Sequence, residues 1–69
     1  MRLTTRQIAD ALGLDESSAR RRIAAWRSRG VAVEREATGG RPTQTVAVAD
    51  VAHHAGLDVA DVLALAGAA

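Results

Sequence analysis

Apolar residues recur at helical spacing in the first part of the chain. Within residues 4–12 they fall at i, i+3 and i+4, as in an amphipathic helix; they are Ile8, Ala11 and Leu12. Thr4 or Thr5 is a suitable N-cap, and Gln7 stands at the capping-box spacing from Thr4. Gly13 suits a left-handed C-terminal position. We therefore predict a helix of about two turns that ends in a sharp bend.

A second helical pattern covers residues 16–29. Asp15 is a good N-cap, and Gly30 marks the end of the helix. The inward positions form a narrow stripe at i, i+4 and i+7; they are Ala19, Ile23 and Trp26. This stripe predicts that one face of the helix is buried and that the rest, which is rich in arginine, faces solvent.

After residue 30 the spacing of apolar residues changes from helical to alternating. Residues 31–36 and 45–48 alternate and are β-branched, which predicts a hairpin joined by a loop over 38–44. Two short helices are expected after it, over 51–55 with Asp50 as N-cap and over 59–66 with Asp58 as N-cap. The apolar stripe of the last helix is Val59, Val62, Leu63 and Ala66. Residues 51–58 repeat the layout of residues 8–15, with four of eight positions identical.

Composition argues against several classes of function. The chain has 69 residues, no cysteine and a single adjacent pair of histidines, so we expect no disulfide, no metal site and no cofactor. No set of residues is spaced like a catalytic triad, and we expect no enzyme activity and no small-molecule ligand. No apolar run approaches the ~20 residues that span a bilayer, and no signal-peptide pattern opens the chain. We therefore expect a cytoplasmic protein without a membrane partner.

Charge is distributed unevenly along the chain. Residues 1–29 carry seven arginines and three acids, a net charge of +4, whereas residues 50–69 carry three acids and no base. The whole chain has a net charge of only +1. This gradient indicates a polyanionic partner for the first half alone.

The order of these elements resembles a winged helix-turn-helix domain. The match is densest over residues 8–19, where small Ala9, Gly13 at the bend, Leu14 between the helices and Ala19 at their crossing agree with the family pattern. Residues 26–31 are similar to the junction between helix and wing. Because the motif begins almost at once, the layout looks most like the MerR and phage-excisionase group. The family commonly has an aliphatic residue at the position of Arg22, so we expect its stem at the edge of the core.

The resemblance implies an α+β fold, mainly helical with a small hairpin, in one domain of residues 1–69. The helix-turn-helix is expected over 4–29, the wing over 31–49, and a closing or dimerisation segment over 50–69. That last segment has no base after its bend, which argues against a contact with DNA.

The DNA-contacting residues follow from this layout. The N-terminal part of the second helix enters the major groove in such domains, and the candidates there are Ser17, Ser18, Arg21, Arg22 and Glu16. Candidates for contacts with the DNA backbone are Thr5, Arg6, Arg20, Arg27 and Arg29. The candidates in the wing are Gly39, Gly40, Arg41 and Thr43.

We therefore predict a protein that binds double-stranded DNA sequence-specifically, as a homodimer or a cooperative oligomer. Its role would be that of a bacterial or phage nucleoid-associated transcriptional regulator, or of an excisionase-like recombination or architectural factor. The alternative is a winged-helix protein-interaction module that does not bind DNA. A steep dependence of affinity on salt would distinguish DNA binding from this alternative.

Overall fold

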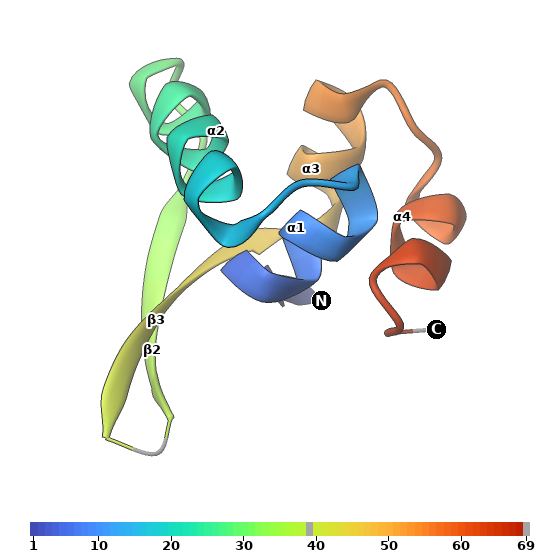
Figure 1. Ribbon diagram of the computed structural model, residues 1–69. Coiled ribbons are helices and arrows are strands. Elements are labelled where there is room, and N and C mark those ends of the chain that lie inside the picture. The colour runs from blue at the N-terminus through green and yellow to red at the C-terminus, as the bar shows by residue number, and fades with distance from the viewer. Residues whose placement is uncertain (39, 69) are drawn as a thin grey trace.

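Short helices and strands follow one another along the chain (Figure 1). The computed structural model describes residues 1–38 and 40–68, apart from the side chains of Thr38 and Arg41. Its elements are β1 (Arg2–Thr4), α1 (Thr5–Leu12), α2 (Glu16–Ser28), β2 (Val33–Thr38), β3 (Arg41–Ala47), α3 (Val48–Ala55) and α4 (Val59–Leu65). The predicted α+β class is confirmed. The sheet, however, has three antiparallel strands in the order β1-β3-β2, because residues 2–4 add a strand that was not predicted.

The predicted capping of α1 and the bend after it are both present. The N–H of Gln7 donates to Thr4 Oγ1 (3.2 Å), and the N–H of Thr4 donates to Gln7 Oε1 (2.9 Å), which completes a capping box. Gly13 is left-handed (φ 68°), and the N–H of Leu14 donates to the Ala9 carbonyl (2.8 Å). A residue with a Cβ is strained in this conformation, so the glycine permits the turn that leads into α2.

Helix α2 buries the predicted stripe. Ala19, Ile23 and Trp26 are all at most 2% exposed. Asp15 caps the helix by accepting from the N–H of Ser18 (2.7 Å). The opposite face therefore stands free. Arg22 is also exposed, and the place of its stem at the core edge stays a prediction.

The hairpin is longer than its composition suggested. Pairing of β2 with β3 runs from Val33 opposite Val46 out to Thr38 opposite Arg41, so the predicted loop over 38–44 was wrong. Pro42 lies within β3, opposite Ala37. Strand β1 pairs only with residues 45–47 of β3, which leaves the edge of β3 beside Pro42 open in the described structure. A proline is tolerated on such an edge because no strand there requires its missing N–H.

Arg2 ties the three strands together. Its Nε donates to Thr45 Oγ1 (2.9 Å) and its Nη2 to the Thr45 carbonyl (2.8 Å) on β3. Nη2 also donates to the Ala32 carbonyl (3.3 Å), and Nη1 forms an ion pair with Glu34 on β2 (2.9 Å). Among the residues whose burial is described, Thr45 is the buried polar one, at 1% exposure. One arginine of the basic first half thus has a structural role.

Helix α3 begins earlier than predicted. It starts at Val48, directly after β3, and its N-cap is Ala47, so Asp50 lies inside the helix and the predicted cap was wrong. The N–H of Val48 instead donates to the Met1 carbonyl (3.0 Å). The bend after α3 reproduces the one after α1, because Gly56 is left-handed (φ 70°) and the N–H of Leu57 donates to the Ala52 carbonyl (3.0 Å). The repeat in the sequence is therefore a repeat of turn geometry.

The C-terminal segment covers the side of the core away from α2. Helix α4 packs on α1 and α3 and lies at the opposite end of the molecule from α2 (Figure 1). Val62 and Ala66 are buried as predicted and Leu63 is partly buried, but Val59 is exposed, contrary to the predicted stripe. The segment closes the core and leaves the outer face of α2 uncovered.

The core joins all these elements through aliphatic side chains and one indole. Its residues are Leu3, Ile8, Ala11, Ile23, Trp26, Val46, Val48, Val51, Ala52, Val62 and Ala66. The imidazole of His54 stacks on Trp26, with ring centroids 5.8 Å apart. His54 is therefore a packing residue at the α2–α3 contact.

Candidate nucleic-acid interface

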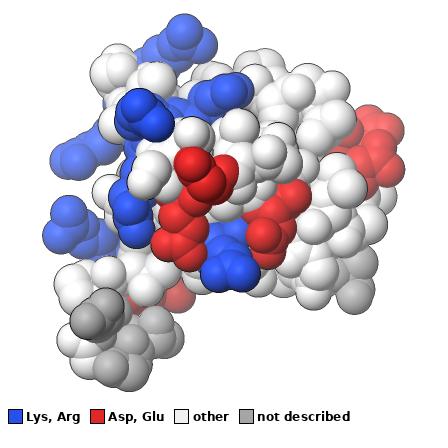
Figure 2. Space-filling model, in the orientation of Figure 1, with Lys and Arg blue, Asp and Glu red and all other residues white. Residues whose placement is uncertain are grey.

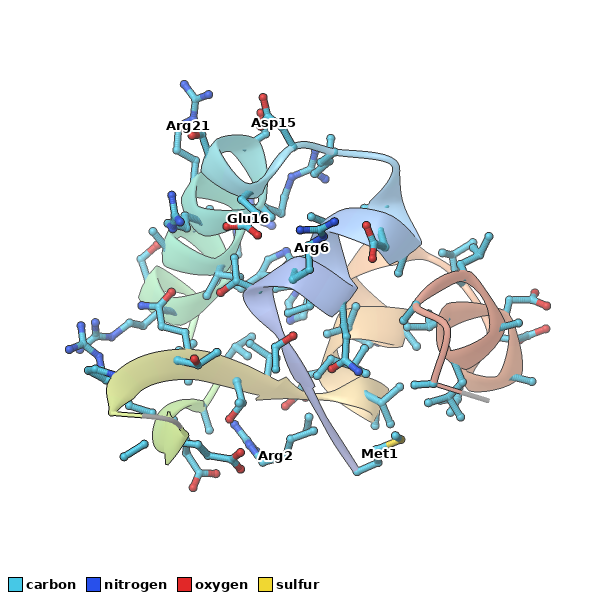
Figure 3. All side chains as sticks on the ribbon, turned by 60° about the horizontal axis from the view of Figure 1, so that its bottom comes forward. Met1, Arg2, Arg6, Asp15, Glu16 and Arg21 are labelled. Atoms are coloured by element: carbon cyan, nitrogen blue, oxygen red, sulfur yellow. The ribbon has the colours of Figure 1, made fainter. Side chains whose placement is uncertain are left out.

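The predicted major-groove residues of α2 differ in how far they are exposed to solvent. Ser17 and Arg21 are exposed, and Ser18 is half-buried. Arg21 and the N-cap Asp15 project from the same end of the molecule (Figure 3). Because residues 100° apart on a helix point in different directions, the three consecutive arginines diverge, and Arg21 points most directly away from the core.

Asp15 keeps a negative charge at the start of α2. Its pKa is lowered mainly by the hydrogen bond from the Ser18 N–H and next by one from the Ser18 hydroxyl; desolvation opposes them, and the charge of Arg21 makes the smallest contribution, which also lowers the pKa. Arg21 is thus the cation whose charge contributes to the lowered pKa of Asp15.

Three predicted contact residues are paired with one another. Glu16 Oε1 lies 3.6 Å from Arg6 Nη1, and Glu16 Oε2 lies 3.2 Å from Arg20 Nη2. Arg6 Nε also lies 3.6 Å from Asp10 Oδ1. Arg6 comes from α1 and Glu16 from α2, and the two side chains face each other (Figure 3). The charges of this four-residue group cancel.

A groove runs between the second half of α2 and the hairpin. It has a volume of about 410 Å³ and is lined by Ile23, Ala24, Arg27, Ser28 and Gln44. Ala24, Arg27 and Ser28 are exposed residues of α2, whereas Gln44 comes from β3. The small side chain of Ala24 leaves the groove open beside Arg27.

Strand register adds Arg35 to this face. Arg35 pairs with Gln44, and side chains of directly opposed residues project from the same face of a sheet. Arg35 is exposed and lies on β2 on the same face of the sheet as Gln44, which lines the groove. Thr43, a predicted wing residue, pairs with Glu36 and lies on the other face of the hairpin.

The hairpin end is described only in part. Gly40 has a positive φ of 83°, and the backbone of Arg41 pairs with Thr38. The predicted contact at Gly39 and that of the Arg41 side chain lie outside the described residues. Thr5, a predicted backbone contact, is the half-buried first residue of α1, and Arg29 is the exposed C-cap of α2.

Basic side chains gather on one side of the molecule. Figure 2 shows them over α2 and beside the hairpin, while acidic side chains lie at the far end and in the centre of this face. Among the described side chains, no carboxylate lies within 4.0 Å of five of the arginines; they are Arg21, Arg22, Arg27, Arg29 and Arg35. This group is the main source of positive potential on that side.

The sequence analysis missed Arg35 as an interface residue, and it placed Gln44 in a loop beside the wing tip instead of in a strand. Arg35 lies two residues from Val33, which packs against the core, and Gln44 lies two residues from the core residue Val46, so the period of the strands places both on the helix-covered face. The sequence analysis did not use this period because it predicted a loop over 38–44, which placed Gln44 outside the strand.

Comparison with known proteins identifies no relative. No family model, no curated protein and no solved structure matches the chain. In the described part of the chain, no three His, Cys, Asp or Glu residues are grouped as metal ligands would be, and no helix there is both long and apolar enough to cross a bilayer.

Proposed function

We propose that this chain is a winged helix-turn-helix domain that binds double-stranded DNA sequence-specifically. Helix α2 would enter the major groove, with the β2–β3 hairpin as the wing against the neighbouring backbone. The protein would act as a small transcriptional regulator or as an excisionase-like recombination or architectural factor.

The observation that supports the proposal best is the exposed arginine face of α2. Four arginines of α2 and its C-cap have no acidic partner within 4.0 Å among the described side chains, although the chain as a whole has a net charge of only +1. The left-handed Gly13 turns α2 away from α1, and the C-terminal helices pack on the other side. A free cationic helix beside an extended hairpin is a suitable shape for a groove flanked by phosphates.

The roles of two arginines give the test. Arg21 would contact base edges, so Arg21→Ala is expected to weaken binding to the preferred duplex by about 5- to 150-fold, the equivalent of ~1–3 kcal/mol, and to affect random duplex much less. Arg27 would contact phosphate, so Arg27→Ala is expected to weaken binding to both duplexes alike and to reduce the salt slope by about 0.9.

The preferred duplex comes from selection out of random DNA with the full chain. Fluorescence anisotropy over about 50–300 mM salt then gives the affinity and the slope of log K against log salt. A salt-independent curve, or equal affinity for selected and random duplexes with both variants unchanged, would overturn the proposal.

A second candidate is a protein-interaction module, and one observation favours it. Leu57, Val59 and Leu65 are exposed at the α3–α4 end, away from the arginine face. Apolar side chains grouped on a surface are typical of contacts between proteins. This candidate gains support if the full chain binds no duplex at low salt.

A further inference from the structure

Glu16 is the acidic residue that joins the two motif helices at the candidate interface. Each of its carboxylate oxygens faces a different arginine, Arg6 of α1 at 3.6 Å and Arg20 of α2 at 3.2 Å. The Arg20 contact is also a hydrogen bond. Both arginines were predicted to bind the DNA backbone, so their cationic groups are already engaged by a side chain of the protein.

These ion pairs are weak enough for a phosphate to replace the Glu16 carboxylate. All three side chains are substantially exposed, Glu16 at 43%, Arg20 at 60% and Arg6 at 73%. Exposed ion pairs are weak and are screened by salt. A DNA phosphate that approaches α2 can therefore displace the carboxylate, but it must compete with it.

We infer that Glu16 competes with the phosphate backbone for Arg6 and Arg20, and so lowers affinity for DNA of any sequence. The inference rests on the proposed function. While the pairs are intact, the two arginines contribute little to electrostatic binding, and the unpaired arginines of α2 carry most of it. Glu16 thereby limits nonspecific binding by a chain whose other α2 arginines are free.

The size of the effect follows from counterion release. Each phosphate contact steepens the slope of log K against log salt by about 0.9, which corresponds to about eightfold in affinity at 0.1 M salt relative to 1 M. Glu16→Gln keeps the size of the side chain and removes its charge. We expect it to raise affinity for random-sequence duplex about five- to tenfold at 0.1 M salt and to steepen the slope by about one.

The pairing itself is tested by a double-mutant cycle with Arg20. Arg20 is chosen because its one carboxylate partner in the described structure is Glu16, whereas Arg6 is also held by Asp10. We expect Arg20→Ala to weaken affinity less in the wild-type chain than in the Glu16→Gln chain. In the Glu16→Gln chain the same substitution should remove most of the gain.

The matched control is Asp61→Asn, which makes the same change in charge on α4, at the far end from α2. It should change affinity less than twofold. Fluorescence of Trp26 during urea unfolding checks that every variant is folded. An effect of Glu16→Gln equal to that of Asp61→Asn, or an equal effect of Arg20→Ala in both backgrounds, would overturn the inference while wild-type binding still stands. Absence of salt-dependent binding by the wild-type chain would instead overturn the proposed function and this inference with it.

Discussion

Removal of the Arg2 side chain tests how the three strands of the sheet are held together. The guanidinium makes two short hydrogen bonds to Thr45, at 2.9 and 2.8 Å, and it is 25% exposed. Its contacts with Ala32 at 3.3 Å and with the 63% exposed Glu34 are the weaker ones. The Thr45 bonds therefore dominate the effect of Arg2→Ala.

The magnitude follows from these contacts. A hydrogen bond that involves a charged group contributes about 1.5–3 kcal/mol, and a buried group that loses its partner adds a penalty. The hydroxyl of Thr45 is such a group, because Thr45 is 1% exposed. Side-chain entropy regained by an unrestrained residue offsets up to about 2 kcal/mol. We expect Arg2→Ala to lower the free energy of unfolding by about 2 kcal/mol, out of roughly 3–10 kcal/mol for a domain of this length.

Urea unfolding followed by the fluorescence of Trp26 measures the change. The indole is 2% exposed, so its emission reports loss of the core. With a slope of about 1 kcal/mol/M for so small a chain, the midpoint should fall by about 2 M, and the melting temperature by about 8–16 °C. Arg22→Ala is the control, because Arg22 is exposed and has no carboxylate within 4.0 Å in the described structure; it should change stability by less than about 0.5 kcal/mol.

A second substitution separates the hydrogen bonds from simple loss of packing. Thr45→Val in the Arg2→Ala chain replaces the orphaned hydroxyl by a methyl group of similar size, and we expect it to restore about 1 kcal/mol. If Arg2→Ala were no more destabilising than Arg22→Ala, or if Thr45→Val brought no recovery, the account of Arg2 as the anchor of the hairpin would be refuted.

Three further predictions concern the motif helices. Ile23→Ala should lower the free energy of unfolding by about 2–5 kcal/mol in the same urea assay, because Ile23 is 1% exposed; a loss below about 1 kcal/mol would contradict its place in the core. Gly13→Ala should cost only about 1–2 kcal/mol, since a Cβ there meets no atom within 4 Å and only the left-handed φ is strained; thermal melting checks this, and a larger loss would indicate a steric clash. Asp15 has a lowered pKa, so its ionised cap stabilises the fold fully above its ordinary value of 3.8, and this stability is lost as the pH falls through the native pKa. Asp15→Asn, which can still accept from Ser18, should therefore weaken the decline in urea midpoint below about pH 4, and an unchanged decline would exclude Asp15 as a contributor.

Local signals accounted for the first two helices. The capping box at Thr4, the cap at Asp15 and the left-handed Gly13 each involve atoms within a few residues of one another, so the order of residue types was sufficient to predict them. The stripe that ends at Trp26 follows from helical period alone. For the same reason the repeated turn at Gly56 is visible in the sequence and has the expected geometry.

Contacts between distant residues decided the rest. Residues 2–4 form a strand only because β3 lies beside them. Helix α3 begins at Val48 because β3 ends directly before it and the Met1 carbonyl accepts the N–H of Val48. The ion pair of Glu16 with Arg6 depends on the angle at which α1 meets α2. The face on which Arg35 lies depends on strand register, where a shift of one residue moves a side chain to the other side of the sheet. Composition and helical period therefore determined that this chain has an arginine-rich helix with one free face, and the i,i+4 spacing already placed Glu16 beside Arg20. Long-range packing alone determined that Arg6 also faces Glu16 and that Arg2 faces Glu34.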